Sequence, residues 1–213
     1  MSETIQQEYP PIVVKRLSGD EYFQYQHGKK EMSVIKFWQW FGSDLSNNVI
    51  RGALAEFIVA SALNIADGVR DMWSSFDLLS KENIKIEVKS SAYLQSWHQR
   101  KLSSISFDIG QSVAYDSTTK EYENEAKRQA DIYVFCLLHF TDKLNLNPLD
   151  LDQWEFFILR STVLNEKHLT QSKLSLSGLL KLAPLKTDYK GIEKAIKDLT
   201  GEKTGEDKSS PLQ

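Results

Sequence analysis

The sequence predicts an α/β domain in which strands alternate with helices, and three segments carry this prediction. Residues 84–91, IKIEVKSS, alternate apolar and polar side chains in the way a half-buried strand does. Residues 52–63, GALAEFIVASAL, are apolar on nearly every side, which is typical of a buried helix. Residues 131–140, DIYVFCLLHF, form an apolar run that is typical of a buried strand.

The N-terminal residues predict an extension whose helices pack on the core. Residues 9–14, YPPIVV, fit a short strand or an extended arm. Residues 21–26, EYFQYQ, predict a first helix, and residues 32–45, MSVIKFWQWFGSDL, predict a second. Because the apolar residues of the second helix recur at helical spacing, we expect Trp38 and Phe41 to lie in the core rather than to form a platform for stacking bases.

The apolar helix that follows contains one unusual residue. Ser46-Asn47-Asn48 provides an N-cap for this helix, and Glu56 is the only charge in its apolar run. An isolated buried carboxylate is costly unless it is paired or bound to a metal. Two interpretations stay open: Glu56 forms a salt bridge, for example to Arg51, or it points into a polar pocket inside the fold.

The next two segments predict a hairpin that carries further charged residues. Asp77 lies in SSFDLLS, residues 74–80, which alternates as a second strand, and Lys81-Glu82-Asn83 supplies the turn. An antiparallel hairpin would project Asp77 and Glu87 from the same face of neighbouring strands. Glu87 and Lys89 also share a face, because strand side chains alternate with a period of two. Two carboxylates and a lysine are therefore expected to converge.

The Glu-x-Lys triplet alone is not specific. It also fits a solvated edge strand whose outer face carries an ion pair. Other acid-x-Lys triplets occur at 125–127, 188–190 and 206–208, but they lie in helix-favouring or polar segments, whereas Glu87 and Lys89 interrupt a β-branched pattern. Carboxylate ligands without Cys or His favour Mg²⁺ or Mn²⁺ over a structural zinc.

The remaining elements follow in a regular order. Residues 104–109, SISFDI, predict a strand, and the second half of the polar stretch 116–129 predicts a charged helix that leads into residues 131–140. Such a helix would act as a crossover between strands of one sheet. Residues 154–165 predict a further strand, and residues 174–185 predict a strand or a short amphipathic unit.

The order of these parts, an acid on a helix, then Asp on one strand, then Glu-x-Lys on the next, resembles the PD-(D/E)XK nuclease superfamily over roughly residues 47–140. The resemblance implies a restriction endonuclease-like core with a mixed central β-sheet flanked by helices, plus N-terminal helices and C-terminal additions. It implies that Asp77 and Glu87 bind the metal, that Lys89 is the catalytic lysine, and that Glu56 is the helix acid that supports the metal site.

The activity implied by this resemblance is that of a metal-dependent endodeoxyribonuclease, a phosphodiester hydrolase of restriction-like type that uses Mg²⁺ or Mn²⁺. DNA is the implied partner, and a homodimer is left open. Two alternatives remain: a repair or junction-cleaving nuclease, and a non-catalytic nucleic-acid-binding module with the same fold. One departure from the family pattern is Phe76, which stands where the family has Pro before its first Asp.

Substrate contacts are expected just beyond the catalytic strand. Gln95 lies on its continuation and is a candidate for orienting water or substrate. His98, Arg100 and Lys101 follow and are candidates for phosphate contacts. The formal net charge of −3 means that any basic surface must be local, and each basic cluster also fits an ordinary solvated surface. Asp108 could reach the site, although a solvent-facing or turn-capping role is favoured.

Length and composition bound the class of protein. The 213 residues suffice for one sizeable core. We expect an N-terminal extension over 1–45, a nuclease domain over 46–200 and a disordered tail over 201–213. The single Cys136 lies in an apolar run and suggests neither a disulfide framework nor a thiolate nucleophile. Neither a membrane span nor a signal peptide is apparent, so a soluble cytoplasmic protein that does not bind membranes is expected.

Overall fold

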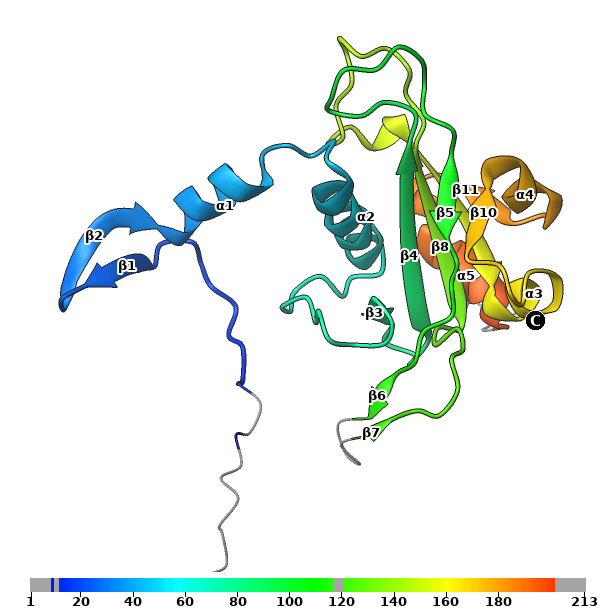
Figure 1. Ribbon diagram of the computed structural model, residues 1–213, viewed down its shortest axis with the longest axis horizontal. Coiled ribbons are helices and arrows are strands. Elements are labelled where there is room, and N and C mark those ends of the chain that lie inside the picture. Colours follow the sequence, from blue (N-terminus) through cyan, green and yellow to red (C-terminus); the bar gives the residue numbers. More distant parts are fainter. Residues whose placement is uncertain (1–8, 10–11, 117–120, 202–213) are drawn as a thin grey trace, which may run out of the picture.

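The computed structural model describes residues 9, 12–116 and 121–201, and its centre is a five-stranded mixed sheet (Figure 1). The strands of this sheet are, in spatial order, β11 (Leu185–Thr187), β9 (Trp154–Arg160), β8 (Ile132–Leu138), β4 (Lys85–Ala92) and β3 (Leu78–Leu79). β4 and β8 run parallel, and the other neighbouring strands are antiparallel. The predicted α/β class, with a mixed sheet between helices, is confirmed.

β8 forms the middle of the sheet and is buried along all seven of its residues. Its continuous apolar sequence follows from this position, because both faces of the sheet are covered. Cys136 is fully buried there, and burial raises the pKa of its thiol. The predicted buried strand over residues 131–140 is therefore confirmed.

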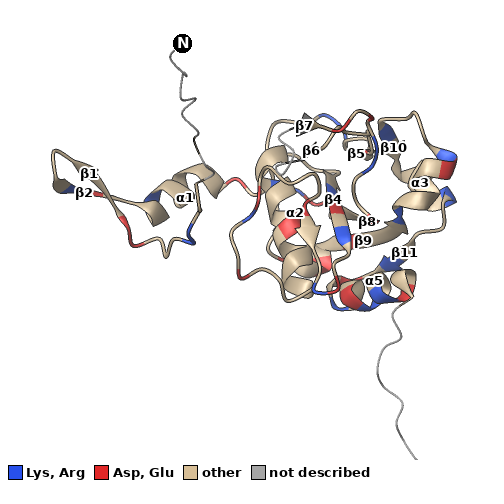
Figure 2. Cartoon of the chain, turned by 90° about the horizontal axis from the view of Figure 1, so that it is seen from below, with Lys and Arg blue, Asp and Glu red and all other residues tan. Residues whose placement is uncertain are grey.

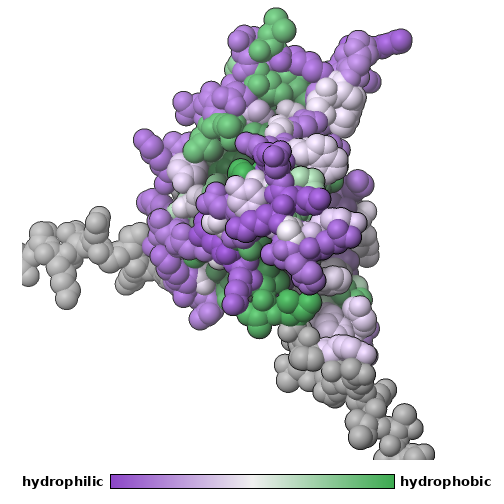
Figure 3. Space-filling model, turned by 90° about the vertical axis from the view of Figure 1, so that its left-hand side faces the viewer, coloured by the Kyte–Doolittle hydropathy of each residue, from purple (hydrophilic) through white to green (hydrophobic). Residues whose placement is uncertain are grey.

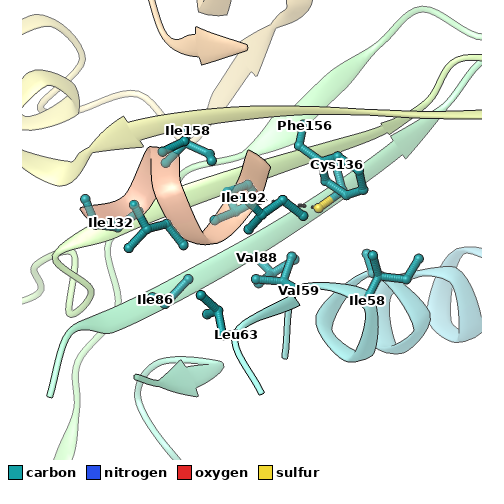
Figure 4. Packing of buried hydrophobic residues seen from close by; sticks show 14 of the residues in the cluster. Ile58, Val59, Leu63, Ile86, Val88, Ile132, Cys136, Phe156, Ile158 and Ile192 are labelled. Atoms are coloured by element: carbon teal, nitrogen blue, oxygen red, sulfur yellow. Dashed lines mark hydrogen bonds between the residues drawn. The ribbon is translucent and has the colours of Figure 1, made fainter. Parts of the chain in front are cut away.

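The two faces of the sheet carry separate apolar cores. On one face, α2 (Asn48–Ala62) and α5 (Ile192–Thr200) pack on the sheet; Figure 4 shows Val59 and Ile192 in this core together with Ile86 and Val88 of β4. On the other face lie β5 (Ser106–Asp108), β10 (Lys173–Ser175), α3 (Ser161–Lys167) and α4 (Leu176–Lys181). The sheet is therefore the middle layer of the domain.

The apolar helix and the hairpin after it match their predictions. Asn47 is the N-cap of α2, and its side chain accepts a hydrogen bond from the Val49 amide at 3.0 Å. β3 pairs antiparallel with β4, with Leu78 opposite Ile86. β3 is shorter than predicted, because only Leu78 and Leu79 form strand pairs before the turn.

The predicted helix in the second half of residues 116–129 is wrong. In the described part of this stretch, β6 (Tyr115–Asp116) pairs with β7 (Glu121–Tyr122), and Ser112 bridges to Lys127. The rings of Tyr115 and Tyr122 pack edge to face at 5.2 Å, and cross-strand aromatic pairs of this kind stabilise a sheet over a helix. The parallel connection from β4 to β8 therefore runs through β5, β6 and β7.

The C-terminal part alternates short strands and helices. The predicted strand over residues 154–165 divides into β9 and α3, separated at Arg160, and a 3-10 turn, η1 (Leu151–Gln153), precedes β9. Residues 174–185 hold β10 and α4, so the prediction of a short amphipathic unit fits this segment. η2 (Tyr189–Gly191) then leads into α5.

The N-terminal arm, residues 18–42, projects away from the domain (Figure 1). It consists of β1 (Tyr22–Tyr25), β2 (Gly28–Ser33) and α1 (Val34–Gly42). The predicted helix over residues 21–26 is wrong: β1 and β2 form a hairpin whose turn residues, Gln26 and His27, adopt positive φ angles of 50° and 63°. The second helix is confirmed as α1 and starts later than predicted.

α1 does not lie in the core. None of its residues is buried, and Trp38 and Phe41 are 40% and 55% exposed. The prediction that these aromatics pack inside the domain is wrong, because helical spacing identifies an apolar face but not the surface that covers it. The domain boundaries at residues 45 and 200 stay predictions, and the tail from residue 202 lies outside the described residues.

Within the described part of the chain, no helix combines the length and apolar character that crossing a membrane would need.

Candidate active site

β4 presents two different surfaces. Ile86 and Val88 are buried in the core beneath α2, whereas Glu87 and Lys89 point to the opposite side. The Lys89 Nζ atom donates a hydrogen bond to Glu87 Oε1 at 2.6 Å. These adjacent acidic and basic positions on β4 can be followed in Figure 2. Their side chains are only 18% and 27% exposed, so this ion pair is partly withdrawn from water.

Asp77 is fixed against the edge of β4 by its backbone and by its side chain. The Asp77 amide donates to the Ile86 carbonyl at 3.1 Å, and Asp77 Oδ2 accepts from the Val88 amide at 2.8 Å. The Asp77 side chain thus binds the Val88 amide just before β3 begins at Leu78. The predicted hairpin therefore brings Asp77 beside the segment that carries Glu87 and Lys89.

The charges of these three residues are coupled. Burial raises the pKa of Asp77 to about 6, and the charges of Glu87 and Glu56 add to this effect. Burial lowers the pKa of Lys89, but its contacts with Glu87 and the charge of Asp77 outweigh burial, so the net shift is upward. Lys89 is therefore a stable cation, whereas burial and the charge of Glu87 favour the protonated form of Asp77.

The donor set fits a hard divalent cation. Magnesium is commonly held by one or two carboxylates, with waters and substrate phosphate completing its shell. Asp77 and Glu87 supply two carboxylates in a partly buried place with uncompensated negative charge. In the described residues, no group of three or more His, Cys, Asp or Glu side chains forms a metal cluster. Asp77 and Glu87 are therefore the two candidate protein ligands at this edge of β4.

Glu56 is paired, but not with the residue considered from the sequence. Both of its carboxylate oxygens accept hydrogen bonds from Arg70, including one from Nη2 at 2.7 Å, and the contact with Glu56 raises the pKa of Arg70. Glu56 also lines a cavity of about 500 Å³ together with Asp77, Arg70 and Arg16. The ion-pair interpretation therefore applies to Glu56, with Arg70 rather than Arg51 as the partner. Its predicted role in metal binding stays a prediction.

Arg51 makes hydrogen bonds within the fold and does not pair with Glu56. Its guanidinium is buried and donates to Gln95 Oε1 at 3.0 Å, to Asn48 Oδ1 at 2.9 Å and to the Ser46 carbonyl at 3.1 Å. These contacts tie the start of α2 to the chain just beyond β4. A salt bridge from Arg51 to Glu56 is therefore not formed.

The predicted substrate contacts fall into two groups. Gln95 is buried, and its amide also donates to the Ala92 carbonyl at 2.9 Å, so its polar atoms serve the fold. His98, Arg100 and Lys101 are exposed in the loop after β4. Lys89 is three residues before the end of β4, so this loop begins roughly 10 Å from it along the strand. The loop is separate from the acidic centre.

Three further residues bear on the site. Tyr133 pairs with Glu87 across β4 and β8 and is buried, and burial followed by the charge of Glu87 raises the pKa of its hydroxyl. Arg70 comes from the loop after α2, and no sequence pattern identifies it as a residue of the site. Tyr133 is hidden inside an apolar run, and only the strand register places it beside Glu87. Asp108 is exposed and accepts from the Gly110 amide at 2.9 Å, in the turn-capping role favoured from the sequence.

Comparison with known families shows a match over most of the chain. The sequence model of the family described as bacteriophage T4 endonuclease IV matches residues 27–177, which is more than half of the chain. The matched region begins in the hairpin of the arm, ends in α4 and contains Glu56, Asp77, Glu87 and Lys89. No curated protein matches the chain.

Proposed function

The chain belongs to the bacteriophage T4 endonuclease IV family, and we propose that it hydrolyses DNA phosphodiester bonds at a metal-dependent centre formed by Asp77, Glu87 and Lys89. The observation that carries this proposal is the position of two carboxylates and one lysine at the edge of β4, where Asp77 accepts a hydrogen bond from the Val88 amide and Glu87 accepts one from Lys89. Perturbed titration in a partly buried cluster is a common property of catalytic sites. We further propose that the centre is of the PD-(D/E)XK type.

Asp77 and Glu87 are the residues that would hold Mg²⁺ or Mn²⁺. When bound, such an ion supplies positive charge to the phosphate oxygens and lowers the pKa of a coordinated water. Asp77 is held in place by the Val88 amide, and Glu87 by Lys89, so both carboxylates are oriented before substrate arrives. Preorganisation of this kind avoids reorganisation during the reaction.

Lys89 acts as a charged hydrogen-bond donor. Its raised pKa means that it keeps its proton at neutral pH, so it orients water and stabilises negative charge on the phosphate rather than accepting a proton. The Glu87 contact at 2.6 Å fixes the direction of the ammonium group. Tyr133 is buried and lies opposite Glu87 in the register of β4 and β8.

Glu56 supports the site through Arg70. Because both carboxylate oxygens contact the guanidinium, Glu56 holds Arg70 at the wall of the cavity that Asp77 also lines. The Arg70 side chain is 41% exposed, so it can meet a DNA phosphate while it remains paired. His98, Arg100 and Lys101, on the separate loop, would contact the backbone further along the DNA.

The proposal also concerns the class of DNA that the protein cuts. A restriction-like enzyme would cut particular duplex sequences, and a homodimer would bring one centre to each strand. A repair or junction nuclease would instead prefer branches, ends or lesions. We favour the restriction-like role because the acids and the lysine follow the order of that superfamily.

The test is DNA cleavage by the purified protein with Mg²⁺ or Mn²⁺ on supercoiled, linear, branched and single-stranded DNA. We expect metal-dependent cutting that EDTA and Lys89→Ala abolish. Lys186→Ala is the matched control, because Lys186 also pairs with a glutamate at 2.6 Å but at the other edge of the sheet. Discrete bands would favour sequence-specific cutting.

A folded protein that cuts none of these substrates would contradict the proposal and favour a non-catalytic binding module. Calorimetric titration with Mn²⁺ provides an independent measurement. Binding that Asp77→Ala does not weaken would remove Asp77 from the metal site.

A further inference from the structure

The N-terminal arm is a folded unit with its own internal contacts. The Val34 amide donates to the Glu21 carbonyl and the Ile35 amide to the Gly19 carbonyl, each at 2.9 Å. Gly19 has a φ of +100°, and a Cβ atom there would lie 3.3 Å from atoms of Ile35 and Trp38. A side chain at residue 19 is therefore disfavoured, and the hairpin and α1 hold a defined relative position.

The folded arm nevertheless exposes an unusually large apolar surface. Nine large apolar side chains are between 40% and 82% exposed: Tyr22, Phe23, Tyr25, Met32, Ile35, Phe37, Trp38, Trp40 and Phe41. At about half exposure and roughly 200 Å² per large side chain, they leave on the order of 900 Å² of apolar surface in water. The largest patch on a typical monomer is about 300–600 Å². One partner of a standard protein interface contributes about 800 Å².

The domain carries a second apolar surface near the point where the arm leaves it. Val49 and Phe57 on the outer face of α2 are 72% and 58% exposed. In the loop after α2, Val69, Met72 and Trp73 are also exposed, Trp73 to 95%. Figure 3 views the molecule from the arm side, with the arm in front of the domain, and shows hydrophobic patches separated by polar residues.

Both surfaces carry charges of both signs: Asp20, Glu21 and Glu31 accompany the lysines of the arm, and Arg70 accompanies the aspartates of the loop after α2. Lys29 and Lys30 lie on the arm hairpin, whereas Asp67 and Asp71 lie in the loop after α2. Lys36 is the only charged residue of α1, so the helix lacks the basic residues that a DNA backbone requires. The exposed apolar side chains of α1 thus have the character of a protein interface.

We propose that two copies of this chain associate by exchanging arms, so that the arm of each copy packs on Val49 and Phe57 of α2 and on Met72 and Trp73 in the other copy. One two-fold operation would cover both apolar surfaces of both copies, whereas an unrelated partner would cover only one of them. The estimated area matches what a stable dimer needs. This proposal does not depend on nuclease activity.

The test is sedimentation velocity of the full chain over a concentration series, without DNA or metal. The key variant is Trp40→Glu, because Trp40 is 82% exposed and its replacement leaves the monomer core intact. The matched control is Gln39→Glu, which adds the same charge to the neighbouring exposed residue of α1. We expect a wild-type dimer, an unchanged dissociation constant for Gln39→Glu, and an increase of at least tenfold for Trp40→Glu.

A second variant tests the receiving surface. Phe57→Glu should weaken the dimer as Trp40→Glu does, and the double variant should show less than the sum of the two effects because the residues share one interface. Circular dichroism and thermal unfolding of each variant check that the domain remains folded. A wild-type protein that stays monomeric into the high micromolar range would overturn the proposal, as would a dimer unaffected by Trp40→Glu. A dimer weakened by Trp40→Glu but not by Phe57→Glu would overturn the exchange onto α2.

Discussion

Two lysine–glutamate pairs on the central sheet have the same Nζ to Oε1 distance but different surroundings. Lys89 and Glu87 lie on β4, and Lys186 and Glu155 join β11 to β9; in both pairs the Nζ to Oε1 distance is 2.6 Å. The lysine of the first pair is 27% exposed and that of the second 56%. The first pair also perturbs the nearby Asp77. Burial and a third charge, rather than the ion pair itself, therefore distinguish a candidate catalytic site from a surface contact.

The sharpest test of this contrast is to remove each lysine. We expect Lys89→Ala to lower the rate of DNA cleavage by about 10²–10³-fold, as loss of one preorganised donor commonly does. Lys186→Ala should leave the rate unchanged. Single-turnover cleavage at saturating metal measures both. Equal losses in the two variants would mean that the pairs are equivalent.

Asp77 should make stability depend on pH in the opposite sense to an ordinary salt-bridged carboxylate. Its pKa is about 6 in the fold against an ordinary value of 3.8, so the folded state binds the proton more tightly. The resulting cost is absent below about pH 4, grows as pH rises toward 6 and is complete above it. Without metal, Asp77→Asn should then be more stable than wild type by up to about 3 kcal/mol at pH 8.

Chemical denaturation at pH 4 and at pH 8 measures this difference, which should nearly vanish at the lower pH. Glu155→Gln, in the exposed pair, serves as the control and should show no comparable gain at pH 8. If Asp77→Asn were less stable than wild type at pH 8, the site would not hold uncompensated negative charge.

Arg70→Gln should have an intermediate effect. It leaves the buried carboxylate of Glu56 without its cation, and because Arg70 is 41% exposed we expect a loss of only about 1–2 kcal/mol in the free energy of unfolding. Arg16→Gln is the control, since its contact with Asp67 is exposed at both ends. Urea denaturation of both variants checks this, and equal stabilities would show that the Glu56 pair adds nothing.

The smallest effect is expected at the exposed pair itself. Lys186→Ala should change the free energy of unfolding by less than about 1 kcal/mol, and the change should shrink at high salt. The same denaturation measurement with and without 1 M salt tests it. A larger, salt-independent loss would point instead to packing of the Lys186 stem on Phe157, whose ring lies 5.6 Å from the ammonium.

The sequence was most informative where local patterns decide the structure. The period-two alternation around Glu87 and the cap at Asn47 predicted β4 and α2 correctly. The pairing of β3 with β4 followed from two short alternating segments and one turn. These signals are local, so a single sequence contains them in full.

The wrong predictions concern regions where tertiary contacts decide the structure. Residues 21–26 form a strand because they pair with β2, and the apolar face of α1 has no cover inside the domain. Arg70 pairs with Glu56, which lies fourteen residues earlier in the chain, and nothing in the spacing favours Arg70 over Arg51. Register between β4 and β8, which brings Tyr133 to Glu87, is likewise a property of the folded sheet.

The two outer strands of the sheet are its shortest: β3 has two residues and β11 has three, whereas β4 has eight. Short outer strands give another molecule few unpaired backbone groups on which to add a strand, which limits edge-to-edge aggregation. At the β3 edge, the Val88 amide that an added strand would need already donates to Asp77. The contact that positions Asp77 therefore also opposes the addition of another strand at this edge of the sheet.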